Sequence, residues 1–163
     1  MLNSMRESCG RRQMYKPGQL LRFDPFFFKN GAKPKPKYFL VLAIQESYLL
    51  LASLPTSQDH VPSSLEHLSG CINDDAGCFN AYVFNAGAPV SIGKSGETFA
   101  FSKRTYIYGE QLDTYLISAI EAMASRADVM VKDKGVLLPD IMTDLVSCLK
   151  HSSRVKRGYK ALM

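Results

Sequence analysis

The chain has 163 residues, of which 46% are hydrophobic and 21% are charged, and its formal net charge is +5. This length suits one compact domain and leaves no room for a second catalytic domain. The longest apolar stretch is too short and too interrupted to span a bilayer, and the N-terminus lacks the apolar segment of a secretory signal. We therefore expect a cytoplasmic protein that does not enter a membrane.

Positive charge is concentrated towards the two ends of the sequence. Residues 1–37 contain nine Lys or Arg against two acids, whereas residues 38–98 contain one Lys against six acids. Beyond Cys148 five more basic residues follow without an acid. Such clusters can neutralise the phosphates of a nucleic acid, and they also suit a solvated tail. We interpret residues 1–14 as a flexible basic N-terminus, residues 15–151 as one domain and residues 152–163 as a basic tail.

The first elements that the sequence predicts are three strands. Residues 19–23 are a short apolar run entered through Pro17-Gly18 and stopped by Pro25, which cannot donate to a sheet ladder. Residues 38–44 and 48–54 are two nearly unbroken apolar runs joined by a tight turn. The domain should therefore begin with a meander, whose first two strands are separated by the basic loop at residues 29–37.

The middle of the chain predicts a long loop and four more short strands. Residues 58–77 are polar and contain several Gly, Asp and Ser, which is typical of a functional, mobile or partly helical loop. Strands are predicted at residues 81–84, 89–92, 98–101 and 105–108. Gly93-Lys94-Ser95 is not a phosphate-binding P-loop, because Ala88 stands where that loop needs a glycine and a strand pattern follows.

Helical periodicity begins only in the last third of the chain. Apolar residues recur at helical spacing in residues 110–125 and again in residues 140–151. The predicted fold is mainly β (α+β), a small barrel with C-terminal helices. The four cysteines show no zinc-ligand spacing, so we expect free thiols and no metal site, with a Cys71–Cys78 disulfide as the less favoured alternative.

The opening of the domain carries a family resemblance. Residues 15–57 read YKPGQLLRFDPFFFKNGAKPKPKYFLVLAIQESYLLLASLPTS, with a Gly18 strand start, an Asp24-Pro25 stop, a basic loop before a FLVL strand, and Thr56-Ser57 at the end of the third strand. This order resembles the opening of the PemK/MazF family of toxin endoribonucleases. The segment FAFSKRTYIYGEQLDTY, at residues 99–115, is similar to the late part of such a domain. The resemblance spans about residues 14–125 and implies an SH3-like barrel of the PemK/MazF/CcdB type that forms a homodimer.

The resemblance also implies a reaction, the metal-independent cleavage of single-stranded RNA without a cofactor. The 2′-hydroxyl attacks the adjacent phosphate, so the site must orient the sugar, stabilise charge on phosphoryl oxygens and protonate the departing 5′-oxygen. Family members place an arginine just before strand two and a Thr or Ser at the end of strand three. Thr56 matches the second position, with Ser57 adjacent. The arginine corresponds to Lys35 by its neighbouring proline, or to Lys37 by register with the FLVL strand.

The replacement of arginine by lysine changes what this position can do. Lysine holds a phosphate as a point charge, but it lacks the planar fork that grips two oxygens at once. Lysine can instead serve as a general acid if the neighbours Lys33 and Lys35 lower its pKa. The alternatives are a solvated lysine loop and a Thr56 that only caps its turn.

Further candidates surround these positions. His60 is a candidate acid or base. The candidate RNA-binding residues are Lys29, Lys33, Phe27 and Gln58. Phe27 belongs to the trio Phe26-Phe27-Phe28, which can stack on unpaired bases, although burial of at least two of the three rings in the core is the simpler expectation.

These residues and the predicted fold are compatible with two classes of function. The first is a toxin-like endoribonuclease whose basic groove would be blocked by an acidic antitoxin protein, as the resemblance implies. The second is a non-catalytic module on the same barrel that binds nucleic acid or protein, either CcdB-like or RNA-binding, because a fold does not by itself determine a function.

Overall fold

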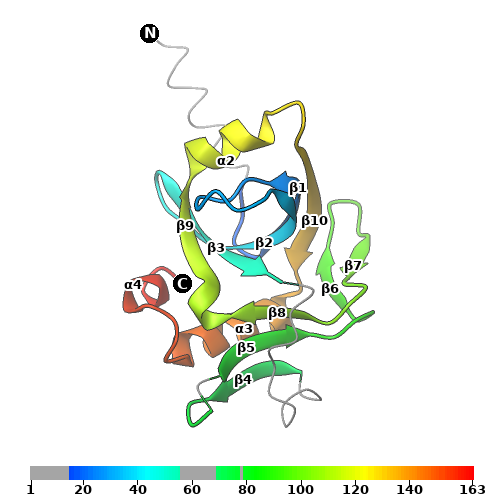
Figure 1. Ribbon diagram of the computed structural model, residues 1–163. Coiled ribbons are helices and arrows are strands. Elements are labelled where there is room, and N and C mark those ends of the chain that lie inside the picture. Colours follow the sequence, from blue (N-terminus) through cyan, green and yellow to red (C-terminus); the bar gives the residue numbers. More distant parts are fainter. Residues whose placement is uncertain (1–14, 56–68, 78) are drawn as a thin grey trace.

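The computed structural model describes residues 15–55, 69–77 and 79–163, and it is mainly β. Its strands are β1 (Gln19–Phe26), β2 (Lys35–Ile44), β3 (Tyr48–Leu54), β4 (Gly70–Asp74), β5 (Phe79–Phe84), β6 (Pro89–Ile92), β7 (Thr98–Ala100), β8 (Thr105–Tyr108), β9 (Leu112–Leu116) and β10 (Met130–Leu137). Two antiparallel sheets result, one in the order β7-β6-β10-β1-β2-β3-β9 and one in the order β4-β5-β8 (Figure 1). The prediction of a mainly β fold is confirmed.

The meander of β1, β2 and β3 forms the centre of the larger sheet. Successive residues of β2 alternate between two clusters of the core: Leu40 and Leu42 belong to one, and Phe39 and Val41 belong to the other. Because side chains alternate between the two faces of a strand, a strand that is buried on both faces must be apolar at every position. This requirement explains the unbroken apolar runs that predicted these strands.

The helices cover different parts of the sheets. Helix α2 (Ile117–Ala124) packs Ile120 into the cluster that contains Phe39, and it lies over one end of the curved sheet in Figure 1. Helix α3 (Pro139–His151) buries Leu145 and Leu149 in the cluster that contains Leu40, beside the small sheet. A third cluster lies within the small sheet, and its members are Ile72, Phe79, Ala81, Val83, Tyr106 and Tyr108. The prediction of a helix at residues 140–151 is confirmed.

The large sheet is curved, but its described strands do not close into a barrel. Strands β7 and β9 stand at its two ends, and no pairing joins them within the described residues. The two sheets meet after β3, where the backbone amide of Tyr106 donates to the carbonyl oxygen of Pro55 at 3.4 Å. In its described part, the structure therefore shows a bent antiparallel sheet but not the closed barrel that the sequence predicted.

The predicted helix at residues 110–125 is wrong over its first half. Gly109–Gln111 is a 3-10 turn, Leu112–Leu116 is strand β9, and the helix begins only at Ile117. Strand β9 pairs with β3 from Tyr48↔Leu116 to Ala52↔Leu112. The apolar residues of this stretch fit both a helical and an alternating pattern, and the open edge of β3 decides between them by offering backbone partners.

Three strand features were not foreseen. Strand β1 continues past Pro25 to Phe26, because its register with β2 shifts between Phe23 and Phe26 and leaves Pro25 outside the regular ladder. Strand β4 lies inside the stretch that was interpreted as a loop at residues 58–77. Strand β10 has Lys132, Asp133 and Lys134 at its centre, so it lacks an apolar pattern, yet it pairs with both β1 and β6.

The cysteine prediction is also wrong. Cys71 in β4 and Cys148 in α3 form a disulfide with a Cα–Cα distance of 5.5 Å and a sequence separation of 77 residues. This bond replaces the predicted free thiols at both positions, and it excludes the alternative partner Cys78. Sequence spacing could not reveal the pair, because two distant cysteines become neighbours only when α3 packs on the small sheet. Cys9 and Cys78 lie outside the described residues.

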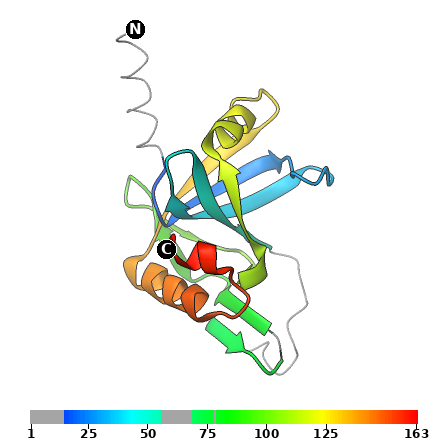
Figure 2. The ribbon, with the colours of Figure 1, turned by 90° about the vertical axis from the view of Figure 1, so that its left-hand side faces the viewer.

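Residues 152–163 pack against the domain. Ser152 and Val155 are buried, and Tyr159 and Leu162 contact the cluster that contains Leu40. The short helix α4 (Arg157–Lys160) lies beside α3 (Figure 2). The flexible segment predicted at residues 1–14 lies outside the described residues. Among the helices that the structure describes, none has the length and apolar character needed to cross a membrane.

Candidate functional site at the start of strand β2

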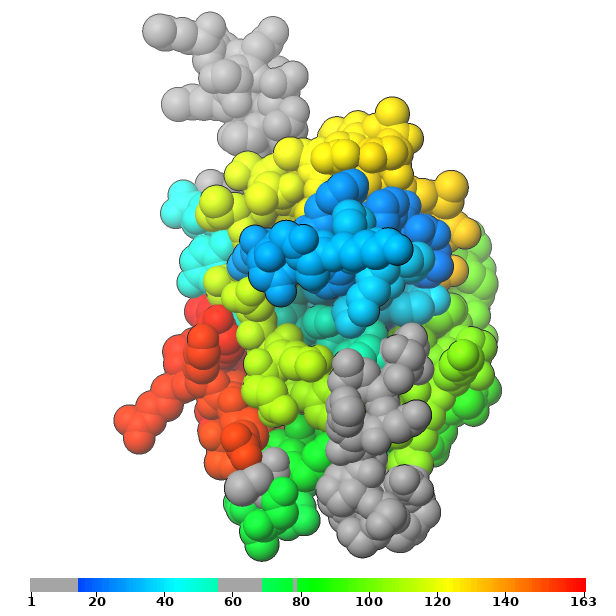
Figure 3. All heavy atoms as spheres, in the orientation of Figure 1, coloured from blue at the N-terminus to red at the C-terminus, as the bar shows by residue number. Residues whose placement is uncertain are grey.

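The two candidate catalytic lysines lie at the start of β2, in the β1–β2 hairpin. This hairpin projects from the body of the protein (Figure 2) and forms the centre of the face shown in Figure 3. Lys35 is exposed and Lys37 is half-buried. The next residue, Tyr38, pairs with Leu54, the last residue of β3. The start of β2 therefore lies beside the end of β3, as the predicted meander requires.

The remaining candidates after β3 cannot be placed beside these lysines. Thr56, Ser57, Gln58 and His60 lie outside the described residues. Pro55 is buried, and its carbonyl oxygen accepts the hydrogen bond from Tyr106 described above. The chain thus leaves β3 from an anchored point close to the start of β2.

Lys37 has an unusual environment for a lysine. Burial lowers the pKa of its ammonium group, and the positive charge of Lys35 lowers this pKa further. Burial acts in this direction because removing a cation from water costs more free energy than removing the neutral amine. Sequence reasoning expected the neighbouring charges to be the cause, whereas burial is the larger one. An ammonium group with a lowered pKa gives up its proton more readily, which suits a general acid.

A group of aromatic and cationic residues lies on the opposite face of β2. The ring of Tyr38 is 5.8 Å from that of Phe99 in β7. The guanidinium carbon of Arg22 lies 5.9 Å from the centre of the Tyr38 ring, and Nζ of Lys134 lies 5.2 Å from the centre of the Phe99 ring. We call Arg22, Tyr38, Phe99 and Lys134 the aromatic–cation cluster. Tyr38 and Lys37 point to opposite faces because they are consecutive in a strand.

Strand register explains why these residues meet. Arg22 of β1 pairs with Tyr38 on one side and with Lys132 of β10 on the other. The guanidinium of Arg22 also donates to the carboxylate of Asp24 at 3.1 Å. Sequence reasoning missed the aromatic–cation cluster, because Lys134 belongs to a strand that was not predicted. The available signal was the pair of aromatic residues Phe99 and Phe101 in a predicted strand.

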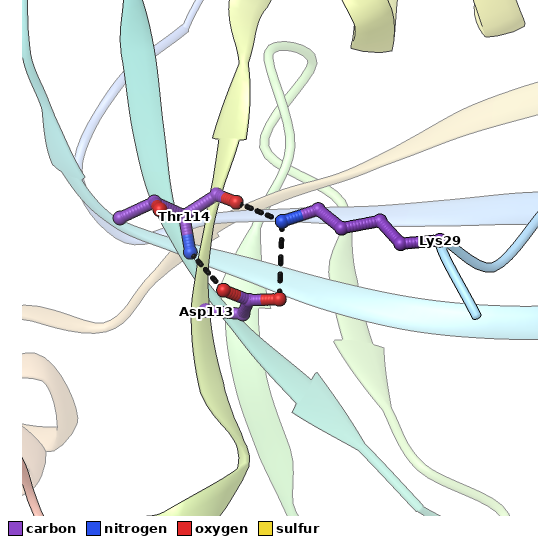
Figure 4. Close-up of polar contacts among 3 residues, drawn as sticks. All are labelled: Lys29, Asp113 and Thr114. Atoms are coloured by element: carbon purple, nitrogen blue, oxygen red, sulfur yellow. Dashed lines mark hydrogen bonds and ion pairs between the residues drawn. The ribbon is translucent and has the colours of Figure 1, made fainter.

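Lys29, a candidate RNA-binding residue, is held by strand β9 (Figure 4). Its ammonium group lies 3.1 Å from a carboxylate oxygen of Asp113, donates to the carbonyl oxygen of Thr114, and lies 3.9 Å from the centre of the Tyr115 ring. The other carboxylate oxygen of Asp113 accepts from the backbone amide of Thr114 at 2.8 Å. Lys29 therefore fastens the β1–β2 loop to β9, and its charge is balanced by Asp113.

The other two RNA-binding candidates that the structure describes, Phe27 and Lys33, differ in exposure. Phe27 is half-buried against the cluster that contains Phe39, and the guanidinium carbon of Arg126 lies 4.0 Å from the centre of its ring. Of the aromatic trio, in which at least two buried rings were the simpler expectation, only Phe26 is fully buried, and Phe28 is half-buried against the same cluster as Phe27. Of the predicted set, Lys29 contacts β9, Phe27 contacts Arg126, and Lys33 is exposed in the loop before β2.

Two cavities on the described part of the protein are lined by neither Lys35 nor Lys37. One cavity of ≈ 770 Å³ is lined by Phe27, Lys29, Tyr115, Leu116 and residues from α2 and α4, and its lining is mainly apolar. A second, of ≈ 650 Å³, lies between β1, β10 and the β6–β7 turn. An RNA site at the start of β2 would be an open surface, which suits an extended single strand.

The β6–β7 turn places a carboxylate of the protein itself where an anion would bind. In the turn, the backbone amide of Ser95 donates to the carboxylate of Glu97 at 3.0 Å, so the protein's own side chain takes the place of an anion. A strand follows this turn, in agreement with the rejection of a P-loop. Within residues 15–55, 69–77 and 79–163, no group of three or more His, Cys, Asp or Glu is arranged to hold a metal ion.

Comparison with known proteins gives no family assignment. No family model matches the chain, and neither the curated proteins nor the solved structures contain a match. The function must be argued from the chemistry of the residues described above.

Proposed function

We propose that this protein is a toxin-like, metal-independent endoribonuclease that cleaves single-stranded RNA at the start of β2. The observation that carries the proposal is Lys37, a half-buried lysine with a lowered pKa, next to Lys35 and beside the end of β3. An SH3-like barrel of the PemK/MazF type, a homodimer, an acidic antitoxin and a cytoplasmic location belong to the same proposal, on the strength of the sequence resemblance.

The two lysines have different roles in this proposal. The 2′-oxygen of the RNA forms a bond to phosphorus while the bond from phosphorus to the 5′-oxygen breaks. Lys37 gives its proton to the departing 5′-oxygen, and Lys35 offsets the negative charge on the phosphoryl oxygens. His60 takes the proton of the 2′-hydroxyl, and Thr56 and Ser57 bind the phosphate. The products are a 2′,3′-cyclic phosphate and a 5′-hydroxyl.

A specific observation favours the second candidate, a non-catalytic RNA-binding module. The aromatic–cation cluster supplies flat rings and positive charge side by side. Such a surface can bind unpaired nucleotides without cutting them.

One assay separates the two candidates. A defined single-stranded RNA is incubated in EDTA with the wild type, Lys37→Met, Lys35→Met and Thr56→Ala, and the product ends are identified. We expect cyclic phosphate ends from the wild type and a loss of rate on the order of a hundredfold in Lys37→Met. Lys150→Met, which changes an exposed lysine of α3, is the control and should retain full activity. RNA binding by the wild type without cleavage would select the binding module.

The predicted assembly has its own test. Sedimentation at micromolar concentration should show a dimer, and a monomer at every concentration would reject that part of the proposal.

A further inference from the structure

We infer that the aromatic–cation cluster is a nucleotide subsite, in which one unpaired base of single-stranded RNA stacks on Phe99 and Tyr38 while Lys134 holds its phosphate. The inference rests on the proposed function in one respect, since the ligand is the same single-stranded RNA. It adds a place for a base, which the two lysines at the start of β2 do not provide.

The two rings are held in place by a buried neighbour. Phe101, which is 3% exposed, makes edge contacts with Phe99 at 5.1 Å and with Tyr38 at 5.3 Å between ring centres. Phe99 and Tyr38 are themselves half-buried, so part of each ring faces solvent. A ring that is already fixed loses little conformational freedom when a base stacks on it, which favours binding. Stacking accepts any base, because every base has a flat π-face.

The charge around the rings favours a phosphate. Arg22, Lys132 and Lys134 lie on the same face of neighbouring strands. The carboxylate of Asp24 lies 3.1 Å from the guanidinium of Arg22 and balances its charge, so the phosphate contact falls to Lys134. Asp133 points to the opposite face, where it accepts a hydrogen bond from the side-chain amide of Gln19 at 2.9 Å. Cations near exposed aromatic rings are the combination by which proteins bind unpaired nucleotides.

The subsite and Lys37 can contact the same RNA strand. Tyr38 follows Lys37 in β2, and the two side chains point to opposite faces of a hairpin that projects from the protein (Figure 2). An RNA strand that crosses the start of β2 meets both. A base in a duplex is stacked on its neighbours and cannot lie on Phe99, so the subsite selects single-stranded RNA over a duplex.

The test uses a short single-stranded RNA with 2′-O-methyl groups, which binds but cannot be cleaved by its own 2′-oxygen. It carries 2-aminopurine, whose fluorescence is quenched when the base stacks. We expect quenching by the wild type, and about tenfold weaker binding with loss of quenching in Phe99→Leu. Phe99→Tyr, which keeps an aromatic ring at this position, should bind and quench as the wild type does. Tyr48→Leu, a half-buried tyrosine at the other end of β3, is the matched control and should bind as the wild type does.

The outcomes separate this inference from the proposed function. If the wild type binds and quenches but Phe99→Leu does so equally, the subsite is rejected and the proposed function stands. If the wild type does not bind the RNA, the proposed function fails as well. Should Phe99→Leu not fold, Lys134→Gln gives the second measurement. This variant should reduce the slope of log K against log salt by about 0.7, which is the value for one phosphate contact on a single strand. An unchanged slope would overturn the inference.

Discussion

Two lysines of the β1–β2 hairpin illustrate how neighbouring residues of one type acquire different properties. Lys29 lies 3.1 Å from the carboxylate of Asp113, so its charge is balanced. Lys37 is half-buried with Lys35 close by, and both effects lower its pKa. The first arrangement favours a permanent cation that fixes a loop, and the second favours a group that exchanges its proton.

The pH dependence of cleavage follows from the lowered pKa of Lys37. A general acid must be protonated, so the rate should fall as the pH rises through this pKa, which lies below the usual lysine value. Lys35→Met removes the like charge, raises the pKa of Lys37 and should move the fall in rate to higher pH. Rate profiles of the wild type, Lys35→Met and the control Lys150→Met measure this shift. An unmoved profile in Lys35→Met would contradict the assigned cause.

The contact between Lys29 and Asp113 predicts unequal effects of lysine substitutions on RNA binding. Lys29→Ala should weaken binding less than Lys35→Ala, because Asp113 already balances the charge of Lys29. Both partners of the pair are about half exposed, so Lys29→Ala should change the free energy of unfolding by less than about 1 kcal/mol. Fluorescence anisotropy and urea unfolding measure the two quantities. Equal losses of affinity would place Lys29 in the RNA site.

At the scale of elements, strand β10 and the Cys71–Cys148 disulfide hold distant segments together. Strand β10 joins β1 to β6, and the disulfide joins β4 to α3. Gly135 in β10 has a φ of +93°, and a Cβ at this position would lie 2.4 Å from the carbonyl oxygen of Ile92. These contacts lead to two predictions about stability.

Gly135→Ala should destabilise the protein by more than about 2 kcal/mol, because the methyl group meets the backbone of β6 in addition to the strain of a positive φ. Gly96→Ala is the matched control, since its φ is +82° and nothing lies within 4 Å of its added Cβ. The strain alone should cost about 1 kcal/mol there. Urea unfolding of both variants measures the difference, and equal losses would show that the contact with Ile92 is easily relieved.

Removal of the disulfide should lower the free energy of unfolding by about 2–5 kcal/mol, because the bond constrains a long loop in the unfolded chain. The measurement is urea unfolding of the wild type and of the double variant Cys71→Ala, Cys148→Ala, each with and without dithiothreitol. The reductant should lower the stability of the wild type to that of the double variant and leave the double variant unchanged. A wild type that does not respond to the reductant would speak against the bond.

At the scale of the whole molecule, the basic hairpin is the feature most relevant to function. The basic hairpin at residues 29–37 projects from the body and contains four Lys without an acid, whereas residues 38–98 contain six acids and one Lys. Single-stranded RNA should therefore bind with an affinity that falls steeply as salt is added, because each neutralised phosphate releases counterions. Lys35→Ala should reduce the slope of log K against log salt by about 0.7. Binding that is insensitive to salt would reject an electrostatic site on this hairpin.

The sequence by itself determined the elements whose own residues must be buried. Strands β2 and β3 are apolar at nearly every position because both faces are covered, and α3 repeats its buried residues, such as Leu145 and Leu149, at helical spacing. The meander alone also predicted that Lys37 lies close to the end of β3, because consecutive strands joined by a tight turn must pair.

Only the tertiary structure decided the features that depend on distant partners. Strand β9 is a strand rather than a helix because β3 offers it a free edge, and β10 is a strand in spite of its central charges because β1 and β6 lie on either side. The same reason applies to side chains: Cys71 meets Cys148, Lys29 meets Asp113, and Lys134 reaches the ring of Phe99. Each of these contacts joins residues far apart in sequence, and a local sequence pattern does not identify a distant partner.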